Sequence, residues 1–284
     1  MIGLGRMGAG MTERLRQAGH EVQTYDPNVE STASSLAELA EQLEPPRHAW
    51  MMVPAGEITE STFQELLGIL EPRDAIVDGG NSNFHDSKRR AAEAKERELF
   101  FVDAGVSGGI WGLREGFALM VGGEAEPVGR LEPIFEALAP AGGYGHVGPS
   151  GAGHFVKMVH NGVEYGLMQA YAEGFELMDA SEFELDLGAV AELWRHGSVV
   201  RSWLLDLLAR AFEQNPGLEG IRGYVEDSGE GRWTMDEAIR TAVPLPAISA
   251  ALFARFASRQ DESFAAKVNA ALREQFGGHA VRRD

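Results

Sequence analysis

The chain of 284 residues contains no cysteine. This absence excludes disulfide bonds, a thiolate nucleophile, and zinc or iron–sulfur sites built on cysteine ligands. The sequence also has no apolar run near the roughly 20 residues that a membrane-spanning helix requires, and its first residues do not form a signal-peptide pattern. We therefore expect a cytoplasmic protein that binds no membrane.

Basic residues are outnumbered, and lysine is scarce. There are 25 lysines and arginines against 43 aspartates and glutamates, which gives a formal net charge of −18. Such a chain repels nucleic acid unless a local basic patch intervenes, so we expect no nucleic-acid partner. The lysines are Lys88, Lys95, Lys157 and Lys267; a salt-adapted host and a GC-rich genome both explain their scarcity. A lysine beside an apolar run, such as Lys157, therefore attracts interest.

Glycines dominate the N-terminal segment, which reads MIGLGRMGAGMTERLRQAGHEVQTYDPN. Gly3, Gly5 and Gly8 have the spacing G-x-G-x-x-G, and an apolar-periodic helix, a β run over 21–25 and Asp26 follow in that order. This order is typical of a dinucleotide site, in which the glycines allow a tight turn, close approach of the pyrophosphate and helix packing. Only two residues precede the first glycine, so we expect either a very short first strand or a natural chain that begins earlier.

Asp26 bears on the identity of the cofactor. Its carboxylate can accept a hydrogen bond from a ribose 2′-hydroxyl, and it would repel a 2′-phosphate. No arginine follows, because the next residues are Pro27 and Asn28. The sequence therefore predicts NAD as the cofactor in preference to NADP.

Strand-like and helical segments alternate over the first half of the chain. Strands are expected at 48–54, 75–80, 99–105, 117–123 and 143–148, and helices at 58–70 and 84–98. This alternation is typical of a Rossmann-type, doubly wound parallel sheet in the α/β class. Ligands of such sheets bind beyond the carboxyl ends of the strands, so we expect Pro54, Asn81, Ser82 and the segment 107–109 along one edge.

The second half has a helical pattern throughout. One long helix is expected from about 154 to 180, followed by helices near 187–196, 199–214, 235–242, 246–258 and 261–275. We therefore predict a dinucleotide-binding Rossmann domain over residues 1–150 and an all-helical second domain over 151–284, with the boundary in a glycine-rich stretch.

Three polar side chains share one face of the long helix. At about 100° per residue, Lys157, Asn161 and Glu164 lie on one stripe. A solvated polar face with a weak ion pair is one interpretation. Four glycines in the segment GAGHFVKMVHNGVEYG (151–166) favour another, a ligand close to the backbone, because glycine inside a helix costs about 1 kcal/mol relative to alanine.

Six motifs resemble those of one family. GLGRMG, DGGNS, VSGG, GAGHFVKMVHNGVEYG, RWT and FARFASR occur in the order seen in 6-phosphogluconate dehydrogenases, and the resemblance covers nearly the whole chain. The short length and Asp26 are similar to the shorter, often NAD-preferring branch of that family.

Two alternatives stay open. β-Hydroxyacid dehydrogenases, such as 3-hydroxyisobutyrate dehydrogenase, share the glycine turn, an SGG and the lysine–asparagine pair, but Glu164 and DGGNS speak against them. A catalytically silent nucleotide sensor is the other, and it would need neither Lys157 nor Glu164.

The resemblance implies oxidative decarboxylation of 6-phosphogluconate to ribulose 5-phosphate and CO₂ with reduction of NAD. Neutral Lys157 would take the C3 hydroxyl proton as the hydride leaves, and burial would favour that neutral form. Asn161 would orient the hydroxyl, and Glu164 would protonate C1 of the enediol after CO₂ has left.

The resemblance also implies two sets of binding residues and no metal. The cofactor set is Gly3, Gly5, Arg6, Met7, Gly8, Asp26, Val53, Pro54 and Asn81. The substrate set is Asn81, Ser107, Gly108, Gly109, His160, Asn161, Tyr165, Arg255, Arg273 and His279. In the family the C-terminal tail, here with Arg273 and His279, reaches the site of a neighbouring subunit, which implies a homodimer or homotetramer.

The sequence departs from the family at the phosphate end. The long enzymes carry a lysine and a threonine ahead of a KWT-like motif, whereas this chain reads DSGEGRWT, with Ser228 and Glu230. A glutamate beside a phosphate is unfavourable. Either Arg232 compensates, or the phosphate is held differently, or the substrate is a non-phosphorylated aldonate.

Overall fold

The computed structural model describes residues 1–283, and the chain divides into two compact units. The first is Met1–His160, and the second begins at Asn161. The division therefore falls inside the long helix α7 (Ala152–Asp179). The predicted domain boundary at residue 150 stays a prediction.

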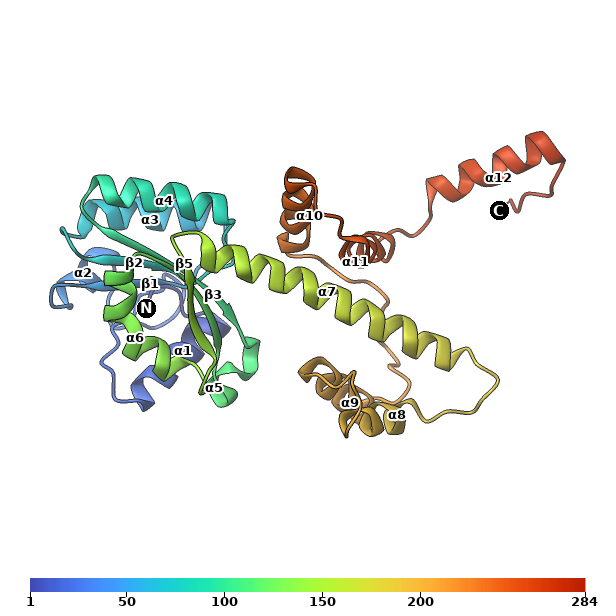
Figure 1. Cartoon of the computed structure of the whole chain (residues 1–284), viewed down its shortest axis with the longest axis horizontal. Helices are drawn as coiled ribbons and strands as arrows, with labels where there is room; N and C mark the ends of the chain where they lie inside the picture. Colours follow the sequence, from blue (N-terminus) through green and yellow to red (C-terminus); the bar gives the residue numbers. More distant parts are fainter. Residues whose placement is uncertain (284) are drawn as a thin grey trace. The chain divides into compact units, whose positions relative to one another are not determined.

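A five-stranded sheet forms the centre of the first unit (Figure 1). The strands are β1 (His48–Met51), β2 (Ala75–Asp78), β3 (Phe100–Ser107), β4 (Ala118–Gly123) and β5 (Tyr144–Gly148), in that spatial order. All neighbours pair in parallel except β3 and β4, which are antiparallel. The predicted α/β class is confirmed, with a correction at β4. Only the short η1 (Gly109–Trp111) and α5 (Gly112–Glu115) separate it from β3, too little chain for the crossover that a parallel pair requires.

The N-terminal segment extends the sheet beyond β1. Ile2 bridges in parallel to both Tyr25 and Met51, and its N–H donates to the Trp50 carbonyl at 2.7 Å. The expected β run over 21–25 is wrong in extent, because only Tyr25 makes a bridge. Tyr25 and β1 thus lie on opposite sides of Ile2, so the strand order reverses there. In doubly wound sheets, ligands bind in the crevice at such a switch point.

Helices cover both faces of this sheet (Figure 1). They are α1 (Arg6–Gln17), α2 (Leu36–Glu41), α3 (Glu57–Ile69), α4 (Phe84–Glu96) and α6 (Ala125–Leu138). On one face, α1 and α6 pack against the sheet through Met11, Leu15 and Phe135. On the other, α2, α3 and α4 contribute a second cluster that includes Leu39 and Phe63. Two dry cores therefore hold the strand ends in place.

The second unit consists of helices. Besides the later turns of α7 they are α8 (Leu187–Arg195), α9 (Trp203–Gln214), α10 (Glu230–Thr241), α11 (Pro246–Ala257) and α12 (Phe264–Gly277). Phe175 of α7 packs with α8 and α9, and Tyr165 packs with Leu252 of α11. The expected helices are present, although α10 begins earlier and α9 later than predicted. None of the helices in residues 1–283 is long and apolar enough to span a membrane.

Candidate active site

Glycine occurs at positions 3, 5 and 8 for different physical reasons. Gly3 has φ +89°, and a Cβ there would lie 2.5 Å from the Met52 carbonyl oxygen. A Cβ on Gly8 would overlap the Gly3 carbonyl oxygen. The fold itself therefore requires glycine at both positions. A Cβ on Gly5, in contrast, would meet no atom within 4 Å. Gly5 leaves open space on the turn, which fits the predicted approach of a pyrophosphate.

The start of α1 also fits a nucleotide phosphate. Arg6 and Met7 form its first turn after Gly5, and no side chain in the described part of the chain caps it. Its N–H groups and helix dipole therefore favour an anion. The Asp26 carboxylate lies at the same turn, where it accepts hydrogen bonds from the N–H of Leu4 (2.7 Å) and of Asn28 (2.8 Å). The residues present thus fit NAD.

A buried aspartate organises the loop after β2. Asp78 accepts from the Gly80 N–H (3.1 Å), the Ser82 hydroxyl (2.7 Å) and Arg90 of α4 (3.2 Å). This network holds the loop that carries the exposed Asn81. Val53 and Pro54 follow β1, the neighbour of β2 in the sheet. Sequence reasoning missed Asp78 and Arg90, since no local pattern joins a strand end to a later helix.

A second buried aspartate fastens α7 to the sheet. Asp103 of β3 is fully buried and is the register partner of Asp78 on β2. Its carboxylate accepts hydrogen bonds from the backbone N–H of Gly151 (2.6 Å) and His154 (2.9 Å). Gly151 directly precedes α7 and His154 lies in its first turn, so Asp103 caps that helix from a neighbouring strand. No local pattern in the sequence distinguishes Asp103 from other acidic residues.

The cap brings α7 into close contact with β3. Gly105, two residues after the cap, leaves no room for a side chain, because a Cβ there would overlap the Cβ of Lys157. Two residues further, the Ser107 hydroxyl lies 3.4 Å from Nε2 of His160. Nδ1 of His160 is 3.5 Å from the Lys157 amine. The structure thus brings together three predicted site residues at the end of β3, where Gly108 and Gly109 follow with positive φ.

The polar stripe of α7 is not a solvated face. Only 7% of Lys157 and 8% of Asn161 is exposed, and Glu164 is partly buried. All three lie on one continuous helix, although Asn161 and Glu164 belong to the second unit. Polar side chains buried to this extent are paired within the protein or with a ligand, so the stripe fits a binding or catalytic role.

In the second unit the predicted substrate residues Tyr165, Arg255, Arg273 and His279 are only partly assembled. The Arg255 guanidinium stacks on the Tyr165 ring, with its Cζ 3.6 Å from the ring centroid. Arg273 lies on α12 and His279 beyond it, and both are exposed. Within residues 1–283, no hydrogen bond or ion pair joins either of them to Tyr165 or Arg255.

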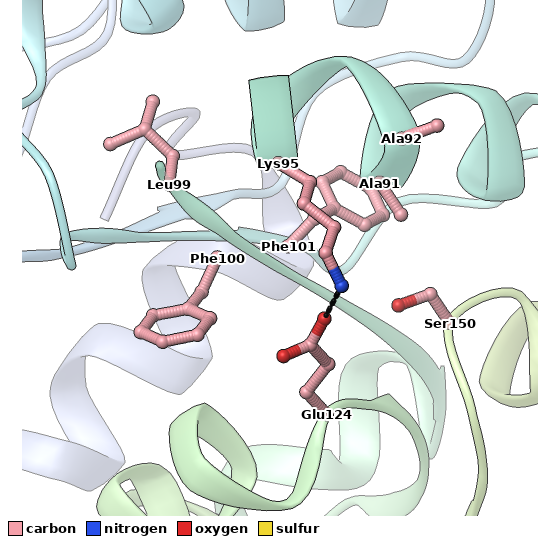
Figure 2. A pocket seen from close by; sticks show the side chains of 8 residues that line it. All are labelled: Ala91, Ala92, Lys95, Leu99, Phe100, Phe101, Glu124 and Ser150. Carbon is pink, nitrogen blue, oxygen red and sulfur yellow. Dashed lines mark hydrogen bonds and ion pairs between the residues drawn. The ribbon is translucent and has the colours of Figure 1, made fainter. Parts of the chain in front are cut away.

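A pocket of about 150 Å³ lies at the amino end of β3 (Figure 2). An ion pair between Lys95 and Glu124 (3.0 Å) crosses it, and Phe100 and Ser150 are among its lining residues. None of the predicted site residues lines it. In the described part of the chain, no group of three or more suitable side chains could hold a metal ion.

Two family models match the chain. The NAD-binding domain of 6-phosphogluconate dehydrogenase matches residues 1–148, and the C-terminal domain of 6-phosphogluconate dehydrogenase matches residues 153–283. A Haloferax volcanii protein, named NAD(+)-dependent, decarboxylating 6-phosphogluconate dehydrogenase, is 44% identical over all of this chain and 98% of its own length.

Solved structures show the same relationship. A Plasmodium falciparum 6-phosphogluconate dehydrogenase has a TM-score of 0.84 and 28% identity; it covers all of this chain, which spans 65% of that protein's length. A Mycobacterium tuberculosis 3-hydroxyisobutyrate dehydrogenase has a TM-score of 0.71 and 25% identity, over 95% of this chain and 97% of its own. The fold is thus common to both enzyme types, whereas both family models and the Haloferax relative carry the name 6-phosphogluconate dehydrogenase. The chain belongs to the 6-phosphogluconate dehydrogenase family.

Proposed function

We propose that the protein oxidises and decarboxylates 6-phosphogluconate to ribulose 5-phosphate and CO₂. The observation that carries this proposal is the buried Lys157, fastened beside Ser107 and His160 by the Asp103 cap. A lysine that is buried against the end of a strand contributes little to solubility. Burial favours its neutral amine, which can accept a proton. Family membership and the name of the Haloferax relative support the same reaction.

The chain's own residues divide the proton transfers between them. Lys157, in its neutral form, accepts the proton of the C3 hydroxyl while Asn161 orients that hydroxyl. NAD held at the glycine turn would supply the acceptor for the hydride that leaves C3. The resulting β-keto acid loses CO₂ because its ketone accepts the electron pair, and protonated Lys157 transfers its proton to the ketone oxygen, which gives the enediol. Glu164 then protonates C1 of the enediol, and Lys157 takes back the remaining hydroxyl proton.

The roles of Lys157 and Glu164 are tested by following NADH and CO₂ separately in single turnovers. Lys157→Ala is expected to abolish both signals, since Lys157 accepts a proton in the oxidation and donates it in the decarboxylation. Glu164→Gln is expected to lower turnover roughly 10²- to 10⁴-fold, the usual contribution of a positioned acid. Glu173→Gln, an exposed acid on the same helix, is the matched control and leaves turnover unchanged. Wild-type turnover in Glu164→Gln would refute the proposed decarboxylase mechanism.

NAD is proposed as the preferred cofactor. The support is the Asp26 carboxylate at the glycine turn, which would repel a 2′-phosphate. Comparing kcat/KM for NAD and NADP tests the preference, and Asp26→Asn is expected to narrow the difference between the two. A wild-type preference for NADP would refute the proposal.

We also propose that two copies of the chain associate through α12. Phe264, Val268, Leu272 and Phe276 are spaced by four residues along that helix, and all four are exposed in the single chain. None of the α12 residues is buried. An apolar stripe of this kind on a helix is stabilised when a partner covers it, and a second copy would bring Arg273 to a neighbour's site.

Sedimentation of the Leu272→Asp variant tests this association. The charge would lie in the apolar stripe, so we expect a smaller particle and a higher KM for 6-phosphogluconate with KM for NAD unchanged. Ala266→Asp, which places the same charge on the opposite side of α12 at an exposed position, is the control. A fully active wild-type monomer would refute the shared site.

A further inference from the structure

Three arginines converge on one short segment of the second unit. Arg232 of α10 donates to both carboxylate oxygens of Asp227 (2.8 and 3.0 Å), and Arg259 donates to one of them (2.9 Å). Arg255 of α11 donates to the carbonyl of Glu226, the preceding residue, at 2.7 Å. Three guanidinium groups are therefore held around residues 226–228, and we name them the arginine cluster.

The cluster has an excess of cationic donors over its buried partner. Only 3% of the Asp227 side chain is exposed, against 53% of Arg232 and 23% of Arg259. Asp227 occupies two of the five N–H groups of Arg232 and one of those of Arg259. Each guanidinium also lies against the Phe256 ring, at 4.5 and 5.2 Å. The two side chains are thus held in position, with N–H groups left for an anion.

Tyr165 connects the cluster to the catalytic helix. The Arg255 guanidinium stacks on its ring, and its hydroxyl accepts a hydrogen bond from the Ser228 N–H at 3.4 Å. Tyr165 directly follows Glu164 on α7. The arginine cluster therefore lies beside the helix turn that carries the proposed acid.

Glu230, which lies two residues before Arg232, does not neutralise the arginine cluster by an ion pair. Glu230 is 2% exposed, and one of its oxygens accepts a hydrogen bond from the Ser228 hydroxyl (2.5 Å). Its other oxygen is buried without a hydrogen-bond partner among residues 1–283. Ser228 and Glu230 thus bond to one another, and neither supplies a cation where one is expected for a phosphate.

We infer that Arg232 and Arg259, oriented by Asp227, bind the phosphate group of the substrate together with Arg255. This inference rests on the proposed function and identifies the residues that select a phosphorylated substrate. Guanidinium groups bind phosphate oxygens with paired, charge-assisted hydrogen bonds. Asp227 is a positioning residue, because its carboxylate orients the two arginines and would itself repel a phosphate.

The experiment compares 6-phosphogluconate with gluconate, which lacks the phosphate. Arg259→Gln and Arg232→Gln are each expected to raise KM for 6-phosphogluconate roughly 10- to 100-fold, the effect of losing a charge-assisted hydrogen bond. We expect kcat, KM for NAD and the activity on gluconate to change little. Arg222→Gln is the matched control, because Arg222 is exposed and pairs with Asp261 (3.1 Å) outside the cluster.

A second measurement separates this inference from the proposed function. Thermal stabilisation of the protein by inorganic phosphate, without turnover, is expected in the wild type and in Arg222→Gln but not in Arg259→Gln. If the wild type turns over 6-phosphogluconate while both cluster variants keep its KM, the inference is wrong and the function stands. If the wild type does not turn over 6-phosphogluconate, the function is wrong, and the phosphate measurement still decides whether the cluster binds phosphate.

A purely structural role of the cluster predicts a different result. Arg259→Gln would then lower the melting temperature and impair 6-phosphogluconate and gluconate equally. Arg259→Lys keeps the charge and loses the paired geometry, so it is expected to give an intermediate KM with a melting temperature near that of the wild type. Equal losses on both substrates in Arg259→Lys would overturn the phosphate assignment.

Discussion

Replacing Asp103 with asparagine tests the contact that fastens the catalytic helix. The carboxylate accepts from the N–H of Gly151 and of His154 at 2.6 and 2.9 Å in a fully buried position. Asparagine has the same shape but only one acceptor oxygen, so one of the two N–H groups would face an NH₂ donor. The variant therefore keeps one hydrogen bond and leaves one buried donor without an acceptor.

The expected loss of stability follows from these contacts. A hydrogen bond to a charged group contributes about 1.5–3 kcal/mol, and an unsatisfied buried donor costs about 1–3 kcal/mol. We therefore expect Asp103→Asn to lower the free energy of unfolding by about 2.5–6 kcal/mol. This is a large part of the roughly 5–15 kcal/mol that stabilises an ordinary domain, so the variant is expected to unfold at a much lower denaturant concentration.

Asp186→Asn is the matched control. Asp186 caps α8 by accepting from the Ala189 N–H at 2.9 Å, but it is exposed. Asparagine is as good as aspartate at such a position, so we expect a change below about 0.5 kcal/mol. Denaturant titrations of both variants at one protein concentration provide the comparison. Equal midpoints for the two variants would refute the view that Asp103 holds α7 against the sheet.

Three further predictions concern the glycines and the arginine cluster. Gly5→Ala is expected to raise KM for NAD while the free energy of unfolding changes by less than about 1 kcal/mol. Gly8→Ala should instead lower the melting temperature. A destabilised Gly5→Ala with an unchanged KM for NAD would contradict the assignment of Gly5 to the cofactor. Gly105→Ala should displace Lys157, lowering kcat and costing about 1–3 kcal/mol by overpacking; unchanged kinetics would refute the close contact. Hydrogen bonds from Arg232 lower the pKa of Asp227 to about 2, so its stabilisation, at most about 2 kcal/mol, is present above about pH 4 and is lost as the pH falls toward 2. Acid titration of Asp227→Asn against the wild type should show this difference shrinking below pH 4, and a constant difference would contradict it.

The sequence by itself was sufficient for features that depend on near neighbours. The glycine spacing at 3, 5 and 8 predicted a turn before a helix, and the structure has that turn. Hydrophobic periodicity located the five strands of the sheet and most helices to within about five residues, because side-chain periods of 2 and 3.6 are properties of a short segment. Helices α2 and α6 were not predicted. The stripe of Lys157, Asn161 and Glu164 was predicted for the same reason, since one helix carries all three. Their catalytic roles stay predictions.

Only the tertiary structure decided which distant segments support that stripe. Asp103 caps a helix that begins almost fifty residues later in the chain, and no local pattern encodes such a pairing. The direction of β4 and the short extent of the 21–25 run were likewise decided by strand neighbours and connections. The arginine cluster depends on Asp227 accepting from two different helical regions. The burial of Asp103 and Asp227 depends on the segments that pack against them. The free energy of their hydrogen bonds therefore depends on contacts that form only when the chain has folded.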